Sequence, residues 1–165
     1  MGSRTAEKSV ILLVEDGEDD ILLTRQAFAR ARIANPLFVV TSGQEAISYF
    51  EGRGQFANRS EFPVPDLVLL DINMHNGDGF TVLRWVRAHK GLKTLRIVML
   101  TTSDETEDID KAYLLGANSY IVKPSTLENF SELMGVAVRF WFEQNVAPCL
   151  FSDEPKGHQF DTSKQ

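Results

Sequence analysis

The chain has 165 residues, of which 43% are hydrophobic and 24% charged, as in a globular domain. Its net charge of −6 argues against general binding to nucleic acid or anionic membrane, because both favour a basic patch. No apolar run approaches the roughly 20 residues of a transmembrane helix, and no hydrophobic signal segment follows the start. The single cysteine, Cys149, cannot form an internal disulfide, so we expect a cytoplasmic protein.

Five short apolar runs predict β-strands. Each run is nearly continuous rather than alternating, which is typical of strands covered on both faces. Successive runs start roughly 30 residues apart, the size of a strand–helix unit, and such repeats predict a parallel sheet with right-handed crossovers. The five runs are residues 10–14, 37–40, 67–70, 97–100 and 120–122.

The segments between these runs predict helices, because Gly or Pro follows each of them. The expected helices cover residues 19–32, 43–51, 78–90 and 104–115. A capping box, Ser125-Thr126-Leu127-Glu128, opens a fifth helix. Its sheet-facing residues are expected to be Leu127, Phe130, Met134, Ala137, Val138 and Trp141. We expect one domain over 8–146 and a tail over 147–165, apolar and then disordered, with no separate output domain.

Polar residues stand where the predicted strands end. Glu15 and Asp16 follow the first run, Asp71 the third, Thr101 the fourth and Lys123 the fifth. The carboxyl ends of the strands form the binding edge of an open parallel sheet. If the strand order is 2-1-3-4-5, strands one and three are neighbours about 5 Å apart. The three carboxylates would then share one pocket.

Carboxylates packed together repel one another, and a hard divalent cation such as Mg²⁺ removes that cost. Lys123 can place its ammonium against Asp71, and Thr101 can donate a hydrogen bond near the same point. Such a clamp suits phosphoryl transfer, in which catalysis consists mainly of positioning and charge neutralisation. A carboxylate can itself be the nucleophile, which would give an aspartyl phosphate at Asp71.

Four segments of the chain, VILLVED, LVLLDINM, IVMLTTS and ANSYIVKP, resemble the receiver domains of bacterial two-component response regulators in order and spacing. The resemblance covers residues 8–142. It implies a flavodoxin-like, doubly wound α/β fold whose five-stranded parallel sheet has the order 2-1-3-4-5 and helices on both faces. It also implies that Asp71 accepts a phosphoryl group from a phosphohistidine of a sensor histidine kinase.

The resemblance further implies a Mg²⁺ site and a switch. Asp16 and Asp71 would bind the metal directly, Glu15 through water, and Asn73 through its backbone carbonyl. The phosphoryl oxygens would be held by Thr101 and Lys123, and the Lys123-Pro124 bond would be cis. Phosphorylation would draw the Thr101 hydroxyl inward, and Tyr120 would swing into the vacated space unless it is a fixed, half-buried aromatic.

A narrower likeness involves VEDGEDD, FPVPDLVLLD, LTTS and RFWFEQ, which look like regulators paired with bacterial phytochrome kinases. One departure is His75, which stands where the family usually has proline; the rigidity of that loop is in question, although no side-chain ligand is lost. His75, His89 and His158 lack a metal-ligand spacing, so we expect surface histidines.

The readout surface is expected on the fourth helix, fifth strand and fifth helix. Three consecutive aromatic residues of the last helix cannot all face one core, and the tail continues the apolar character, which is typical of an interface. We therefore expect a homodimer. Its predicted interface consists of Phe140, Trp141, Phe142, Leu150 and Phe151.

Three other functions remain open on the same fold. An aspartate-nucleophile phosphatase would need a second Asp two residues after the first strand's nucleophile, and Glu15-Asp16-Gly17-Glu18 lacks that spacing. A flavin carrier would need a hydroxyl-rich phosphate loop where this chain is acidic. A phosphorylation-independent adaptor would not need the intact set of Asp16, Asp71, Thr101 and Lys123.

Overall fold

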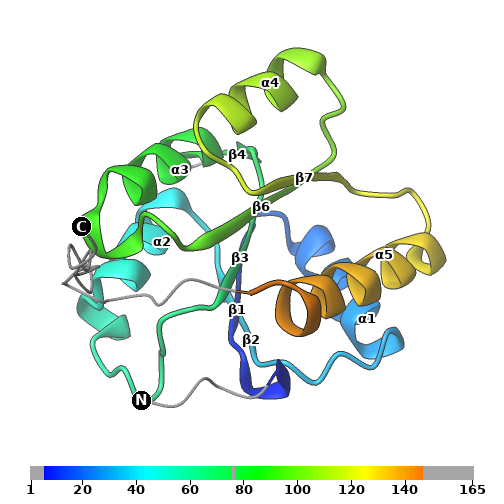
Figure 1. Ribbon diagram of the computed structural model, residues 1–165, viewed down its shortest axis with the longest axis horizontal. Helices are drawn as coiled ribbons and strands as arrows, with labels where there is room; N and C mark the ends of the chain where they lie inside the picture. Colours follow the sequence, from blue (N-terminus) through cyan, green and yellow to red (C-terminus); the bar gives the residue numbers. More distant parts are fainter. Residues whose placement is uncertain (1–5, 76, 147–165) are drawn as a thin grey trace, which may run out of the picture.

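The computed structural model describes residues 6–75 and 77–146, which form a five-stranded parallel sheet between two layers of helices (Figure 1). The strand order is β2-β1-β3-β6-β7, and every neighbouring pair is parallel. Numbered among themselves, these five strands have the predicted order 2-1-3-4-5, so the predicted fold is confirmed. Their bounds are Ile11–Val14 (β1), Leu37–Val40 (β2), Leu67–Leu70 (β3), Arg96–Thr101 (β6) and Ser119–Val122 (β7).

Two apolar clusters hold the helices against the two faces of the sheet. One cluster joins α1 and α5 to one face, and the other joins α2, α3 and the inner side of α4 to the opposite face. The bounds of these helices are Glu18–Arg30 (α1), Gly43–Glu51 (α2), Gly79–Ala88 (α3), Thr106–Leu114 (α4) and Leu127–Arg139 (α5). Short 3-10 turns cover Ala6–Lys8 (η1), Gly54–Phe56 (η2) and Lys90–Leu92 (η3). No helix in the described ranges has both the length and the apolar character needed to span a bilayer.

The burial of each strand follows its position in the sheet. All four residues of β1 and all four of β3 are buried, as their continuous apolar runs predict. The edge strands β2 and β7 are only partly buried, because each has a neighbour on one side alone. The prediction that all five strands are covered on both faces is therefore right for the centre of the sheet and too strong for its edges.

Several helix ends differ from the predicted ones for local reasons. Helix α1 ends at Arg30 rather than at residue 32, since Arg32 has a φ of 55° and cannot continue the helix. Helix α4 starts at Thr106 rather than at residue 104. Ahead of it, Ser103 Oγ accepts a hydrogen bond from the Glu105 N–H at 3.4 Å, which competes with helical geometry.

The cap of α5 lies one residue later than the predicted capping box. Thr126, not Ser125, is the N-cap, and its hydroxyl accepts the Asn129 N–H at 3.3 Å. Glu128 is therefore not at the position of a capping box, and its carboxylate instead pairs with Arg30 of α1 at 2.7 Å.

The end of α5 changes to a π-helix over Phe140–Gln144 (η4). Trp141 and Phe142 pack against the cluster under α5, whereas Phe140 is 50% exposed. Arg96 of β6 donates to the Trp141 carbonyl and lies over the Phe142 ring. Two of the three predicted interface aromatics thus contribute to intramolecular packing. The other two predicted interface residues, Leu150 and Phe151, lie outside the described residues, as does the tail over 147–165.

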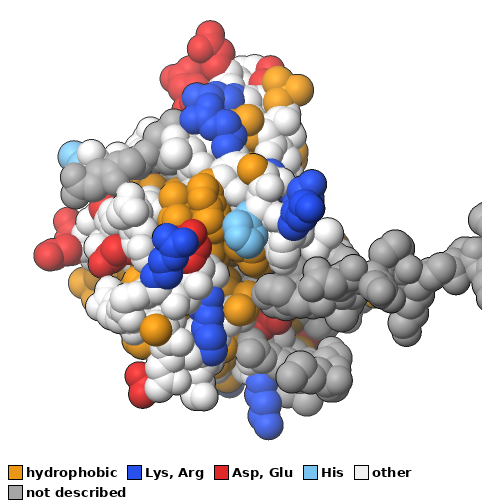
Figure 2. Space-filling view, turned by 90° about the vertical axis from the view of Figure 1, so that its left-hand side faces the viewer, with side chains coloured by type: hydrophobic (Ala, Val, Ile, Leu, Met, Phe, Trp, Pro, Cys, Tyr) orange, Lys and Arg blue, Asp and Glu red, His pale blue; other side chains and the backbone are white. Residues whose placement is uncertain are grey.

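Basic side chains are distributed rather than gathered on the face shown in Figure 2, which lies at the left of Figure 1. Hydrophobic side chains reach the surface there between charged side chains of both signs.

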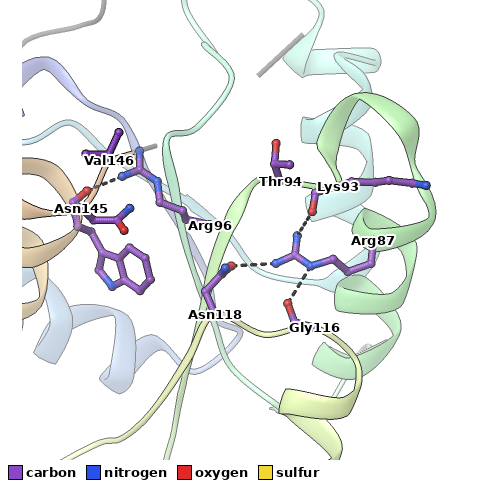
Figure 3. A pocket seen from close by; sticks show the side chains of 9 residues that line it. Arg87, Lys93, Thr94, Arg96, Gly116, Asn118, Asn145 and Val146 are labelled. Carbon is purple, nitrogen blue, oxygen red and sulfur yellow. Dashed lines mark hydrogen bonds between the residues drawn. The ribbon is translucent and has the colours of Figure 1, made fainter. Parts of the chain in front are cut away.

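The amino-end edge of the sheet is tied together by an arginine of α3. Arg87 donates hydrogen bonds to the carbonyls of Gly116, Lys93 and Leu95 at 2.8–3.2 Å and to Asn118 Oδ1 at 2.9 Å. Figure 3 shows this guanidinium beside a hollow of about 420 Å³. Because the backbone oxygens of the loops occupy its donors, we interpret Arg87 as a structural tie.

Candidate functional site

Residues after β1 and β3 meet at the carboxyl edge of the sheet. Val14 pairs with Leu70 in the parallel register, so Glu15 and Asp71 follow side by side. The Asp71 N–H donates to the Val14 carbonyl at 3.0 Å, which extends the ladder by one residue. Both acidic residues are buried, Asp71 with 5% and Glu15 with 2% of its surface exposed.

A short hairpin and a glycine fix the chain immediately after Asp71. The hairpin pairs β4 (Asn73–Met74) with β5 (Gly77–Asp78), and the sequence did not predict it. Gly79 starts α3 against the backbone of Asp71, since a Cβ at Gly79 would lie 2.1 Å from the Asp71 carbonyl oxygen. Glycine is therefore required here by close approach of two backbone segments.

The ammonium of Lys123 forms a buried ion cluster, although not with the predicted partner. Its Nζ lies 2.5 Å from Glu15 Oε2 and 3.1 Å from Asp20 Oδ1. No ion pair joins Lys123 to Asp71, both of which lie in the described ranges, so the predicted direct contact is wrong. A flexible four-carbon stem can reach several carboxylates, and the one it selects here is Glu15, which is as deeply buried as Lys123 itself.

Charge and burial shift the pKa values of this cluster. Burial raises the pKa of Glu15, and the hydrogen bonds from Lys123 and the Gly17 N–H only partly offset that effect. Burial lowers the pKa of Lys123, but the hydrogen bond and charge of Glu15 and the charge of Asp71 outweigh it, so the pKa is raised overall. The negative charge of Asp71 thus acts on both members of the pair.

No peptide bond between the described residues is cis, so the peptide bond between Lys123 and Pro124 is trans. The predicted cis bond before Pro124 is therefore wrong. The trans isomer is the more stable form of an X–Pro bond by about 0.5–1 kcal/mol. Lys123 reaches Glu15 from this trans backbone while its N–H donates to the Thr101 carbonyl at 2.7 Å.

Asp16 is turned toward the hairpin, where it meets His75. Asp16 Oδ2 accepts the His75 backbone N–H at 2.5 Å and lies 3.0 Å from His75 Nδ1. Burial would raise the pKa of Asp16, but these contacts with His75 together hold the pKa below its ordinary value. His75 is a surface histidine, as predicted, with 93% of its side chain exposed, but it is bound to a predicted metal ligand.

Thr101 and Tyr120 are connected through Ser103. Thr101 is fully buried, and its Oγ1 accepts the Ser103 N–H at 3.3 Å. The Tyr120 hydroxyl donates to the Ser103 carbonyl at 3.0 Å, and the ring packs against the cluster under α3 and α4. Burial raises the pKa of Tyr120, and the negative charges of Asp108 and Asp71 add to the shift.

The structure thus brings Glu15, Asp71 and Lys123 to one edge, with Thr101 on the strand between the latter two. Sequence reasoning missed Asp20 and the His75 contact. The signal for Asp20 was the acidic run after β1, in which Asp20 is the last acidic residue and lies in the first turn of α1. The contact of His75 depends on the hairpin β4–β5, which carries too few residues to be recognised as strands.

A metal ion would need backbone or water ligands at this edge. Within the described residues, no three His, Cys, Asp or Glu side chains converge closely enough to hold a metal by themselves. A hollow of about 470 Å³ lies beside the hairpin. It is lined by Ile72, Asn73, Met74, His75, Phe80, Asp108 and Lys111.

Comparison with known proteins identifies the class to which this fold and edge belong. Residues 11–134 match the response regulator receiver domain family, and the chain belongs to that family. It is therefore a phosphorylation-accepting receiver of two-component signalling, similar to the single-domain regulators associated with phytochromes.

Three individual proteins are similar over nearly their whole length. Response regulator Rcp1 of Synechocystis sp. is 30% identical over 90% of this chain and 99% of its own. RPA3017, a response regulator in red light signaling of R. palustris, has a TM-score of 0.82 and 35% identity, over 86% of this chain and 99% of its own. The phosphorylated cyanobacterial phytochrome response regulator RcpA has a TM-score of 0.78 and 33% identity, with the same coverage. The crystal structure of the Mn²⁺-bound form of Rcp1 is similar to this chain with a TM-score of 0.74.

Proposed function

We propose that Asp71 is the phosphoacceptor of this receiver and that its donor is a phosphohistidine of a sensor histidine kinase. One Asp71 carboxylate oxygen forms a bond to phosphorus while the bond from phosphorus to the histidine nitrogen breaks. The observation that carries this proposal is the placement of Asp71, a largely buried carboxylate at the carboxyl edge beside the Glu15–Lys123 pair. In this proposal the receiver accepts the phosphoryl group on its own aspartate and turns over no external substrate.

The donor set around Asp71 fits a divalent cation. Three carboxylates, those of Glu15, Asp20 and Asp71, lie around a single ammonium, and Asp16 follows Glu15 at the same edge, so the edge carries excess negative charge. All candidate ligands are oxygens, as Mg²⁺ prefers, and Mg²⁺ usually keeps several waters beside one or two carboxylates. When bound, the cation would neutralise charge on the phosphoryl group. We propose that it is Mg²⁺.

The proposed ligands are those the family resemblance implies. They are the carboxylates of Asp16 and Asp71, the backbone carbonyl of Asn73, and Glu15 through water. The relative Rcp1 has a Mn²⁺-bound form, which supports a divalent cation for this chain.

We assign the remaining polar groups to the phosphoryl oxygens. The Lys123 ammonium lies among three carboxylates, so a change in its side-chain torsions would carry it from Asp20 toward a group on Asp71. Thr101 Oγ1 accepts the Ser103 N–H, so the hydroxyl hydrogen is not used in that bond and can donate to a phosphoryl oxygen. Loss of that N–H bond would disturb the Ser103 carbonyl that anchors the Tyr120 hydroxyl. This chain of contacts supports the proposed Thr101–Tyr120 switch.

The proposed readout surface comprises α4, β7 and α5. Large apolar side chains are exposed on all three elements. They are Tyr113, Leu114, Val122 and Val136, with Phe140 at the end of α5. Exposed apolar surface of this extent supports a protein interface. We propose a homodimer through this surface, with Phe140 as its central contact, continued by Leu150 and Phe151 of a tail over 147–165 that follows a receiver over 8–146.

We propose that the kinase is a bacterial phytochrome, and that both proteins meet in the cytoplasm. The supporting observation is the likeness to RcpA and RPA3017 over 86% of this chain.

The test is incubation with Mg²⁺ and a small phosphodonor, followed by the intact mass. The wild type should gain one phosphoryl group and Asp71→Asn none. Asp19→Asn, a change at an exposed acidic residue near the site, is the matched control and should behave as wild type. A phosphorylated Asp71→Asn would refute the assignment, and steady release of phosphate from an added phosphomonoester would favour the phosphatase instead.

A further inference from the structure

His75 combines three features that the proposed phosphoacceptor function does not use. Its ring is almost fully exposed, yet its Nδ1 lies 3.0 Å from Asp16 Oδ2, and its backbone N–H holds the same oxygen at 2.5 Å. An exposed ring has little packing to orient it, so the contact with Asp16 is what positions the imidazole. The imidazole nitrogen therefore lies beside a carboxylate proposed to bind the cation.

The spacing of the two atoms suits adjacent ligands of one metal ion. Adjacent ligands of an octahedral ion with bonds of about 2.1 Å lie about 3.0 Å apart. The backbone bond from His75 to Asp16 keeps the two side chains together whichever way the ring turns. The hollow of about 470 Å³ is lined by both His75 and Asn73, two of the proposed ligands.

We propose that His75 Nδ1 is an additional ligand of the divalent cation and shifts the preference of the site toward transition metals. Imidazole binds Mn²⁺, Co²⁺ and Zn²⁺ more favourably than Mg²⁺, which takes oxygen ligands. An all-oxygen site with water in place of the imidazole would discriminate less. The inference rests on the proposed cation site and names the ligand that sets its selectivity.

Calorimetric titration with Co²⁺ alone and with Mg²⁺ alone tests the selectivity. His75→Phe keeps an aromatic ring and the backbone N–H donated to Asp16 but removes the ring nitrogen. It should weaken Co²⁺ binding at least about tenfold and change Mg²⁺ binding much less. His89→Phe is the matched control, because His89 is also exposed and its ring stacks on Trp85, away from Asp16. An unchanged ratio of Co²⁺ to Mg²⁺ affinity in His75→Phe would overturn the proposal.

Pulsed electron paramagnetic resonance with Mn²⁺ tests direct ligation. Wild type and His89→Phe should show coupling to an imidazole ¹⁴N, and His75→Phe should not. Absence of the coupling in wild type would show that His75 only orients Asp16, and persistence of the coupling in His75→Phe would show that another histidine is the ligand. Either result would sink the inference. Neither experiment uses a phosphodonor. A negative result for His75 as a metal ligand can therefore be distinguished from a negative result for Asp71 as the phosphoacceptor.

Discussion

Replacing Lys123 by methionine should destabilise the fold, because it leaves Glu15 charged and unpaired. The side chains of Lys123 and Glu15 are 4% and 3% exposed, and their closest atoms are 2.5 Å apart. Removing one member of such a pair costs about 3–5 kcal/mol, whereas an exposed pair contributes at most about 1 kcal/mol. Methionine retains an unbranched apolar stem, so the lost charge rather than a cavity dominates the change.

Urea denaturation followed by circular dichroism at pH 8 measures this free energy of unfolding. Asp20→Asn is the control, since Asp20 is 38% exposed and should cost less than about 1 kcal/mol. The double variant Lys123→Met with Glu15→Gln should be more stable than the sum of the single losses predicts. A loss below about 1 kcal/mol for Lys123→Met would refute the buried-pair interpretation.

The loss of unfolding free energy in Lys123→Met should also depend on pH. The folded-state pKa of Glu15 is already raised above 4.5 by burial, and removing Lys123 removes the interactions that lower it. A raised pKa means that the folded protein binds this proton more tightly than the unfolded chain does. Stability is therefore lost as pH rises from 4.5 through the folded pKa. The difference in unfolding free energy between Lys123→Met and wild type should therefore shrink from pH 8 to pH 5. A difference that grows instead would contradict the view that the unpaired charge of Glu15 causes the loss.

Three further changes test local features. Gly79→Ala should drive a Cβ into the Asp71 carbonyl and slow phosphorylation at least about tenfold, measured by intact mass; an unchanged rate would contradict the close approach. Arg87→Met should lower unfolding free energy by about 2–4 kcal/mol, measured in urea, because several carbonyls lose their donor; a loss below about 1 kcal/mol would remove its role as a tie. Thr126→Ala should cost about 1 kcal/mol and Ser125→Ala almost nothing, and the reverse order would restore the predicted capping box.

The fold was predictable because its strongest signals are local. Continuous apolar runs identified the buried strands, and their spacing implied helical crossovers, which allow few arrangements of a parallel sheet. The bounds of β2, β3 and α2 are as predicted. Helix ends were less predictable, because single contacts such as the Thr126 cap or the positive φ of Arg32 decide them.

The placement of the candidate site residues at one edge was predictable, but their contacts were not. Strand ends bring Glu15, Asp71 and Lys123 to one edge whatever their side chains do. The choice of Lys123 between Asp71 and the pair Glu15 and Asp20 depends on torsions of a long side chain and on relative burial, which a one-dimensional pattern does not contain. The approach of His75 to Asp16 likewise depends on the pairing of β4 with β5, which brings together residues from beyond the strand β3.

The position of the phosphoryl group tests the central claim most directly. Borohydride reduction of the phosphorylated protein converts an aspartyl phosphate to homoserine, and tandem mass spectrometry of its peptides locates that residue. We predict homoserine at position 71 and unmodified aspartate at positions 16 and 20. Homoserine at either of those positions, or a phosphoryl group retained on a histidine or lysine nitrogen, would contradict the account.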